Sequence, residues 1–357
     1  MKSDKINLFY NPDRNQVADL LKGFAVLFMI QVHLTENFLI NSHYDKIFSR
    51  ISFFLGGTPA APVFMIVMGY FISLKKDFIH YLEKGIILFL GGILLNIGLN
   101  LSFLINYFQN KIIDEDPLRF ILGADILPFA GISLILLGLL RKIFLEKYYL
   151  YSILAIIVTI VSDFLNSDLI PLKNVTEFSN SLKFVFSFIY GCSEWSYFPI
   201  IPWLFYPSMG FSLRLISDRL TRNIKRWLLI ISIFVLVFFS KETYNQIIVF
   251  ENYYHHGLLV AIWNLSFVIT WSWILYEIDN RFGKNLFLIL IKWIGKNVTY
   301  IYVFQWLIIG NLTFFLFNSQ NEYQVLVWFF IVLLSSSLLT YFFVQYRIKK
   351  SLIRINE

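Results

Sequence analysis

The sequence predicts an all-α fold, a polytopic membrane helix bundle of about ten transmembrane helices with both termini in the cytoplasm. Of its 357 residues, 57% are hydrophobic and 19% aromatic, and only 15% are charged. Soluble domains carry roughly a quarter charged residues, so this composition excludes an ordinary globular enzyme and a disordered protein. Apolar runs that approach the roughly 20 residues needed to cross a bilayer recur along the whole chain, which is typical of a multi-pass integral membrane protein.

We expect one membrane span in each of ten apolar segments. The segment 172–193 mixes charged and apolar residues, which favours an interfacial or re-entrant piece. Because no internal repeat or linker interrupts the chain, we expect a cytoplasmic tail over 1–16, one transmembrane domain over 17–345 and a basic cytoplasmic tail over 346–357. The expected spans are 17–40, 55–74, 84–105, 120–140, 148–166, 197–215, 227–240, 257–278, 294–317 and 324–345.

The Lys and Arg residues predict the orientation of the bundle. Alternate loops, counted together with the two tails, hold 21 and 7 of the 30 basic residues, and the other two, Lys22 and Lys296, lie inside expected spans. Cytoplasmic loops carry the excess of basic residues, so both termini are expected in the cytoplasm. The net charge of +7 therefore reflects topology and indicates no nucleic-acid partner. The polar start up to Gln16 predicts no cleavable signal peptide, and the single cysteine, Cys192, allows no intrachain disulfide and no cysteine-based metal site.

Charged and titratable side chains form a stripe along the first expected span. Lys22 and His33 are eleven residues apart. This spacing puts them roughly 20° apart around the helix and about 16 Å apart along it. Glu36 lies one turn beyond His33 on the same side. Since charged groups inside spans are costly and usually functional, the inner cation is a candidate for holding a phosphate-bearing cofactor and the imidazole for acid–base chemistry. The alternative is a snorkelling lysine and a histidine hydrogen-bonded within the bundle.

The second expected span begins with the small residues GGTPAA, starting at residue 56. Thr58 is a good N-cap residue and Pro59 suits the first helical position, so we expect a helix N-terminus at about the level of His33. Its free amide groups would suit a developing oxyanion, which makes Thr58 a candidate on the substrate side. Tight helix packing through small residues, which is common in membranes, is the alternative.

Two further candidate groups lie near the outer ends of expected spans. Asp125 opens the fourth span, either as a carboxylate partner that orients His33 or as a solvated N-terminal cap. Trp195 and Tyr197 precede or begin the sixth span. Their aromatic faces suit a sugar ring, although Trp and Tyr are also common at any membrane interface.

Two pairs of neighbouring residues complete the candidates. Lys296 and Asn297 lie near the inner end of the ninth expected span, where they would join Lys22 in binding a cofactor phosphate. His255 and His256 lie in the loop at the outer start of the eighth span, with no partner expected on the Lys22 face. Two adjacent histidines without further ligand spacing are a poor metal signal, so no metal is expected.

Four segments carry a more specific signal. DLLKGFAVLFMIQVH (19–33) holds a basic residue, ten intervening residues and a histidine, and GGTPAAPVFMIVMGYFIS (56–73) follows it. YFPIIPWLFYPSMGFSL (197–213) and WIGKNVTYIYVFQW (293–306) belong to later helices. Together they resemble membrane acyltransferases of the heparan-α-glucosaminide N-acetyltransferase kind and their bacterial relatives.

The resemblance implies an enzyme that takes an acyl group, usually acetyl, from cytoplasmic acyl-CoA and delivers it through the bundle to a sugar amine or hydroxyl on the far side. It also implies that His33 is the catalytic residue. The spacing of about 16 Å is comparable with an extended pantetheine arm, so CoA phosphates near Lys22 would put the thioester near His33. Relatives usually have Arg at the position of Lys22, and commonly His at the position of Gln305, so no role is carried over to Gln305.

We therefore expect an acyltransferase of the bacterial cytoplasmic (inner) membrane that modifies carbohydrate in the cell envelope. It would use acetyl-CoA, no metal, and an extracytoplasmic carbohydrate or glycolipid acceptor. His33 would deprotonate the acceptor or carry the acyl group transiently, oriented by Glu36 or Asp125, while Lys22 and Lys296 hold the CoA phosphates. The rival class is a transporter or permease for a glycolipid or small solute, since intramembrane His and Lys also suit a substrate or proton pathway. Many transporters have paired repeats with broken helices, which this sequence lacks.

Overall fold

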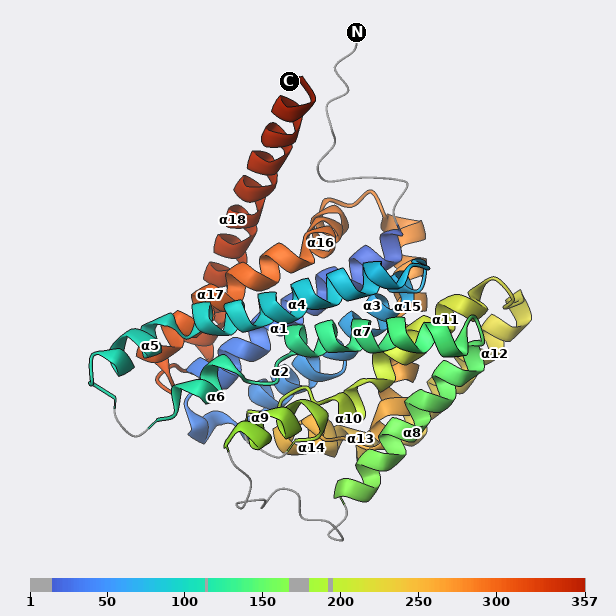
Figure 1. The fold of residues 1–357 in the computed structure, drawn as a ribbon, viewed down its shortest axis with the longest axis horizontal. Helices are drawn as coiled ribbons and strands as arrows, with labels where there is room; N and C mark the ends of the chain where they lie inside the picture. Colours follow the sequence, from blue (N-terminus) through green and yellow to red (C-terminus); the bar gives the residue numbers. More distant parts are fainter. Residues whose placement is uncertain (1–14, 113–114, 167–179, 192–194, 357) are drawn as a thin grey trace. The chain divides into compact units, whose positions relative to one another are not determined.

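The regular structure of this protein is helical in the computed structural model (Figure 1). The residues it describes contain no strand, so the predicted all-α membrane fold is confirmed. The tail up to residue 14, the stretch 172–179 of the expected interfacial segment and Cys192 lie outside the described residues. The described ranges are 15–112, 115–166, 180–191 and 195–356.

Within the described ranges, most helices are joined by short connections, and a 3₁₀ turn, η1 (Asn41–His43), follows the first of them. In chain order the α-helices are α1 (Gln16–Phe38), α2 (Ile47–Gly57), α3 (Ala61–Ile72), α4 (Phe78–Leu99), α5 (Leu101–Phe108), α6 (Pro117–Ile121), α7 (Ile126–Phe144), α8 (Tyr148–Asn166), α9 (Asn180–Ile189), α10 (Ile200–Trp203), α11 (Phe205–Ser217), α12 (Arg222–Phe238), α13 (Ser240–Ile247), α14 (Phe250–Tyr254), α15 (Leu258–Phe282), α16 (Leu286–Lys296), α17 (Val298–Leu316) and α18 (Glu322–Asn356).

In the described part of the chain, eight helical stretches are long and apolar enough to cross a membrane, or nine if one bent pair is a single span. The difference from ten lies mainly at the expected span 197–215, which is divided into α10 and α11 at Leu204, and Ile201 inside α10 is itself non-helical. With 13 residues, α11 is about 20 Å long and shorter than the bilayer core. The expected span 227–240 belongs to the bent pair α12 and α13, which turns by 71°. The eight stretches are Gln16–Phe38, Ile47–Ile72, Phe78–Leu99, Ile126–Phe144, Tyr148–Leu165, Leu258–Phe282, Val298–Leu316 and Glu322–Lys350.

The chain groups into two compact units. Unit 1 consists of the segments 1–56 and 271–357 and contains α1, nearly all of α2, the end of α15 and α16 to α18. Unit 2 consists of residues 57–270 and contains α3 to α14 and the first half of α15. The domain boundaries expected at residues 16 and 345 remain a prediction.

In unit 1, α1 and α17 run in the same direction. Just beyond the end of α17, the backbone amides of Asn318 and Gln320 donate to the carbonyl oxygens of Asn37 and Phe38, the last two residues of α1, at 3.1 and 2.8 Å. At the opposite end, α16 contacts the first turn of α1 at Asp19 and leads directly into α17. The two helices therefore lie alongside each other, in parallel, from their first turns to their last.

Two glycines bring α1 and α16 into backbone contact. A Cβ atom on Gly23 would lie 2.2 Å from the carbonyl oxygen of Ile291, and one on Gly295 would lie 1.8 Å from the carbonyl oxygen of Asp19. Neither position has room for a side chain, and such close approach through small residues is a common way to pack membrane helices. The crossing fixes the start of α1 against the end of α16.

Unit 2 uses the same device between α3 and α11. A Cβ atom on Gly69 would lie 2.0 Å from the carbonyl oxygen of Pro207, and one on Gly210 would lie 2.0 Å from that of Ile66. The contact is reciprocal, so each helix presents a glycine to the backbone of the other. Packing at this distance fixes the position of α11, whose buried side chains include members of a polar network described with the site.

Candidate active site

His33 and Glu36 form a hydrogen-bonded pair near the end of α1. His33 Nδ1 lies 2.9 Å from Glu36 Oε2, and the two side chains are 16% and 20% exposed. The helix produces this pair because residues three apart lie on one face. A carboxylate can only accept a hydrogen bond, so Nδ1 carries the hydrogen and Nε2 of the neutral ring keeps its lone pair. His33 thus has the tautomer that a general base requires.

Trp306 of α17 packs against the His33 ring. The ring centroids are 4.1 Å apart and the planes are inclined by 39°. Within the described chain, His33 Nε2 makes no hydrogen bond. The imidazole is therefore oriented on one nitrogen by Glu36 and held on its face by an indole, with the other nitrogen left for a substrate.

Further hydrogen bonds secure the end of α1 that carries the pair. The Tyr44 hydroxyl donates to the carbonyl oxygen of Glu36 at 2.7 Å, and Asn37 Nδ2 donates to the carbonyl oxygen of His33 at 2.8 Å. Burial and, secondarily, the charge of Glu36 raise the pKa of Tyr44 to about 12, so its hydroxyl keeps the proton that it donates. Gln31 Nε2 donates to the carbonyl oxygen of Ser52 and ties α1 to α2.

At the other end of the stripe, Lys22 is paired with a residue that the sequence analysis missed. Lys22 Nζ lies 2.9 Å from Asp19 Oδ1, and the two side chains are 15% and 6% exposed. The i, i+3 spacing of opposite charges was the signal that would have found this partner. An ammonium group has three donors, so the pair leaves Lys22 with donors for a phosphate.

Lys296 and Asn297 end α16 at the crossing with α1. Lys296 is the last helical residue and follows Gly295, which touches Asp19. Asn297 is the C-cap, and its Nδ2 donates to the carbonyl oxygen of Trp293 at 2.9 Å. Its amide therefore serves its own helix end, while Lys296 and the start of α1 lie at one crossing.

The unit 1 candidates thus gather at two levels of the α1–α17 pair. Lys22 and Lys296 lie at the start of both helices, and His33, Glu36 and Trp306 lie further along them. The helical rise separates the two levels by about 16 Å along α1 and about 14 Å along α17. The arrangement has basic residues that suit an anionic group at one level and an acid–base pair at the other, at a distance comparable with an extended pantetheine arm.

Asp125, in unit 2, caps its own helix. It is the N-cap of α7, and its Oδ1 accepts from the backbone amide of Ile126 at 2.6 Å. This is the capping alternative of the sequence analysis. The carboxylate stabilises the start of α7. A role of Asp125 in orienting His33 stays a prediction.

Trp195 and Tyr197 lie beside the start of α7. The backbone amide of Ala124 donates to the carbonyl oxygen of Trp195 at 3.0 Å, and that of Phe198 donates to the carbonyl oxygen of Ala124 at 2.8 Å. The Tyr197 ring is 44% exposed and lies 5.3 Å from the ring of Tyr254. The structure therefore brings both aromatic candidates to the same end of unit 2 as Asp125.

Thr58 does not begin a helix. Helix α2 continues to Gly57, and the N-cap of α3 is Ala60, with Pro62 in the first turn. The expected capping role is wrong because the Thr58 hydroxyl is completely buried and donates to Asn264 Oδ1 at 2.6 Å. A role of Thr58 on the substrate side stays a prediction.

That bond begins a directed chain of buried hydrogen bonds in unit 2. Asn264 Nδ2 donates to the Tyr206 hydroxyl at 2.7 Å, which lies 2.6 Å from His256 Nε2. His256 Nδ1 lies 2.7 Å from the carbonyl oxygen of Tyr253, which can only accept, so Nδ1 donates and Nε2 accepts from Tyr206. The Tyr206 hydroxyl accepts from Asn264 and donates to His256, so the donors all point one way and the chain runs from Thr58 to Tyr253.

His256, which the sequence predicts in a loop without a partner on the Lys22 face, has its partners within unit 2. It is 2% exposed and hydrogen-bonded through both ring nitrogens. Burial lowers the pKa of His256 to about 4, so its ring is neutral at neutral pH. No group of three His, Cys, Asp or Glu side chains in the described ranges has the spacing of a metal site.

We expect Tyr206→Phe to destabilise the protein. The substitution leaves His256 Nε2 and Asn264 Nδ2 buried without a partner, at about 1–3 kcal/mol for each group. Thermal unfolding of the purified protein in detergent measures the effect. Tyr149→Phe is the matched control because that ring is 48% exposed, and it should unfold like the parent. Equal stability of the Tyr206 variant would show that the chain of hydrogen bonds contributes little.

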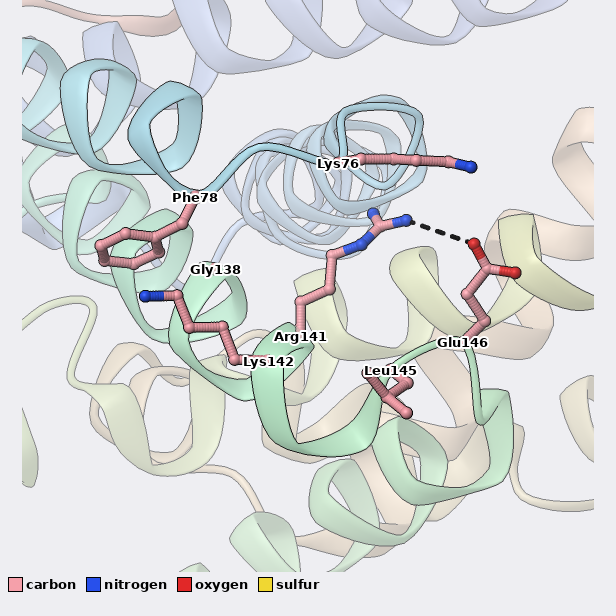
Figure 2. Close-up of a pocket in the computed structure, with 7 residues that line it drawn as sticks. All are labelled: Lys76, Phe78, Gly138, Arg141, Lys142, Leu145 and Glu146. Carbon is pink, nitrogen blue, oxygen red and sulfur yellow. Dashed lines mark ion pairs between the residues drawn. The ribbon is translucent and has the colours of Figure 1, made fainter.

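A basic cleft of about 290 Å³ lies where α4 begins and α7 ends (Figure 2). Arg141 Nη1 donates to the carbonyl oxygens of Ser73 and Lys75, both at 2.6 Å. The Lys142 ammonium lies over the Phe78 ring, 3.9 Å from its centroid. Two of the cations in the cleft thus hold the turn between α3 and α4 against α7, and none of the candidate residues lines it.

Comparison with known proteins gives one result. A family model described as an acyltransferase domain matches residues 15–345. The match includes every candidate residue named above. No curated protein and no solved structure matches the chain.

Proposed function

Since this chain belongs to the acyltransferase domain family and is a membrane acyltransferase, we propose that it moves an acetyl group from cytoplasmic acetyl-CoA to an extracytoplasmic sugar or glycolipid. The observation that carries the proposal is the His33–Glu36 pair, with Nε2 open and a basic helix end about 16 Å away on the same helix. The acceptor would be an amine or hydroxyl group. The protein would lie in a bacterial cytoplasmic membrane with both termini inside.

The residues of unit 1 support a division of roles. Lys22 and Lys296 would bind CoA phosphates at the start of the α1–α17 pair, since a phosphate accepts charge-assisted hydrogen bonds from ammonium groups. His33 Nε2 would remove the proton from the acceptor amine or hydroxyl as it attacks the thioester carbonyl carbon. Glu36 would keep the proton-accepting tautomer and stabilise the imidazolium that forms.

The acceptor side is supported by unit 2. Tyr197 presents a half-exposed ring beside Trp195, and aromatic surfaces of this kind suit the apolar face of a sugar. The excess of Lys and Arg in the set of loops that includes 214–226 supports a cytoplasmic location for those loops, and so an extracytoplasmic location for Trp195 and Tyr197. Acyl transfer across the membrane follows if donor and acceptor approach from opposite sides.

Mass spectrometry of cell-envelope glycans from cells with and without this protein tests the proposal. In cells without the protein, we expect one or more glycans to be lighter by about 42 Da for each missing acetyl group. Restoring the parent gene should restore the mass, and restoring the His33→Ala gene should not. Identical glycans, together with no release of CoA thiol from acetyl-CoA by the purified protein in a glycan extract, would overturn the proposal.

We expect Lys22→Ala to weaken binding of acetyl-CoA about ten- to hundredfold. The lost contact is a charge-assisted hydrogen bond, which contributes roughly 1.5–3 kcal/mol. Because Asp19 would be left buried without its partner, the variant is made together with Asp19→Asn. Calorimetric titration with CoA and with acetyl-CoA measures the affinities.

Two controls separate this contact from general charge. Lys22→Arg keeps the cation and offers a fork for phosphate, so binding should be retained or improved. Lys349→Ala removes an exposed lysine near the end of α18 and should bind like the parent. Parent-like affinity of the Lys22→Ala, Asp19→Asn protein would make the position of Lys22 a packing feature.

A further inference from the structure

Helix α17 buries polar atoms that have no partner in the described chain. Gln305 is completely buried, and neither its Oε1 nor its Nε2 makes a hydrogen bond. The indole Nε1 of the next residue, Trp306, is also buried and unbonded. Three unsatisfied polar atoms thus lie on two consecutive residues.

The other Asn and Gln side chains that are buried as whole residues, among those the structure describes, make hydrogen bonds. Asn264 uses both ends of its amide in the unit 2 chain, and Asn96 and Asn297 donate to backbone carbonyl oxygens. A buried polar group without a partner is destabilising, and such groups in a folded protein call for a specific explanation. Among these buried residues, Gln305 is therefore the exception, since both ends of its amide have no partner.

The exception lies beside the proposed base. The Trp306 ring is 4.1 Å from the His33 ring, between centroids, and Gln305 is its neighbour on the same helix. Residues 302, 305 and 309 are all buried on α17, so Gln305 belongs to the face that packs inside the protein. Trp306 Nε1, on the ring that packs against His33, and the amide of the adjacent Gln305 are therefore buried groups whose N–H donors have no partner in the described residues.

We propose that Gln305 Nε2 and Trp306 Nε1 bind the carbonyl oxygen of the acyl thioester and stabilise the oxyanion formed there. This inference rests on the proposed function and assigns the donors of that same site. The acceptor oxygen or nitrogen bonds to the thioester carbon while its proton passes to His33 Nε2, and the C=O electron pair moves to the oxygen. The C=O bond then re-forms, the C–S bond breaks, and the CoA thiolate takes the proton from His33.

The chemistry of the two donors suits this step. Negative charge develops on the thioester oxygen only during the reaction, and preorganised N–H groups in a dry site stabilise it without reorganising. An indole offers a donor and no acceptor, and the amide offers two donors. Removal of one oxyanion donor typically lowers kcat about 10²–10³-fold.

Two variants isolate the donors from the packing. Trp306→Phe keeps an aromatic ring on His33 and removes the indole N–H together with part of the ring system, and Gln305→Leu keeps a branched side chain of similar volume and removes the amide. Trp328→Phe, in α18, is the matched control because that indole packs on Phe38 and away from His33. Without ligand, Gln305→Leu should unfold at a higher temperature than the parent, since it removes unsatisfied buried atoms.

Isotope-edited infrared difference spectra with acetyl-CoA labelled with ¹³C at the carbonyl give a readout that needs no acceptor. On the parent and on Trp328→Phe, the carbonyl band should move to lower frequency than in solution. On Trp306→Phe and Gln305→Leu it should return toward the solution position, while calorimetry shows CoA binding unchanged. Acetyl transfer to the glycan acceptor found by mass spectrometry should fall about 10²-fold or more in each.

The outcomes distinguish the two levels of inference. A parent protein that binds neither CoA nor acetyl-CoA would overturn the proposed function and this assignment with it. A parent that binds and transfers acetyl, but whose carbonyl band is the same in both variants, would overturn the assignment alone. A Gln305→Leu protein that loses stability and transfer together, with the band unmoved, would make Gln305 a structural residue and also overturn it.

Discussion

Acetyl transfer should fall by about 10²–10⁴-fold or more in His33→Ala, while binding of acetyl-CoA stays within a few-fold of the parent. The reason is that His33 Nε2 is the open nitrogen of a ring whose other nitrogen is fixed by Glu36, so its loss removes the proton acceptor and leaves the basic end of α1 intact. CoA-thiol release in the presence of the glycan acceptor measures transfer, and calorimetry measures binding.

Two control variants distinguish a catalytic role of His33 from a structural one. His80→Ala removes a histidine of unit 2 that is not fully buried and should leave transfer unchanged. His256→Ala should lower thermal stability, and transfer only in proportion to the folded fraction, because its ring is a buried hydrogen-bonded residue. If His33→Ala keeps turnover near the parent value, or if it loses transfer only by unfolding, the base mechanism is wrong.

Composition and apolar run length were enough to predict the all-α membrane fold, because a bilayer demands the same hydrophobic length from every span. They did not predict the break at Ile201, which precedes Pro202. A residue before proline is pushed out of the helical region, and Ile201 accordingly has φ −98° and ψ 115°. Hydropathy does not register such a restraint, so the break inside α10, within one expected span, could not be predicted from it.

Within one helix, the site could be predicted from spacing. The His33–Glu36 pair follows from helix periodicity, and the Asp19–Lys22 pair has the same i, i+3 signal although it was not used. Contacts between helices could not be predicted in this way. The packing of Trp306 on His33 joins residues far apart in the chain, and it depends on how α17 lies along α1.

The surroundings of the adjacent histidines, His255 and His256, could not be predicted from the sequence. The sequence predicts the adjacent histidines in a loop and gives no partner for either, yet His256 is hydrogen-bonded to the Tyr206 hydroxyl and to the carbonyl oxygen of Tyr253. The donors and acceptors of a buried hydrogen-bond network come from segments that are far apart in the sequence and meet only in the folded protein. No regular spacing of residues in the sequence predicts such a network.

Glu36→Gln should lower kcat for acetyl transfer about 10²–10⁴-fold with little change in acetyl-CoA affinity. The carboxylate of Glu36 accepts from His33 Nδ1 and so leaves the lone pair on Nε2. An amide in its place can donate to Nδ1 instead, which moves the ring hydrogen to Nε2 and removes the base. It also carries no negative charge to stabilise the imidazolium. Steady-state rates of CoA-thiol release measure the effect.

The chain provides a matched control for this substitution. Glu322 also pairs with a histidine, His43, with 3.1 Å between Oε2 and Nδ1, and it lies in the same unit. Glu322→Gln changes the same atoms at a pair with no proposed role, so its turnover should equal that of the parent. Glu36→Asp keeps the charge on a shorter side chain and should fall between the parent and Glu36→Gln. Equal turnover of Glu36→Gln and Glu322→Gln would show that Glu36 neither sets the His33 tautomer nor stabilises its charged form, and His33 would then act without a carboxylate partner from α1.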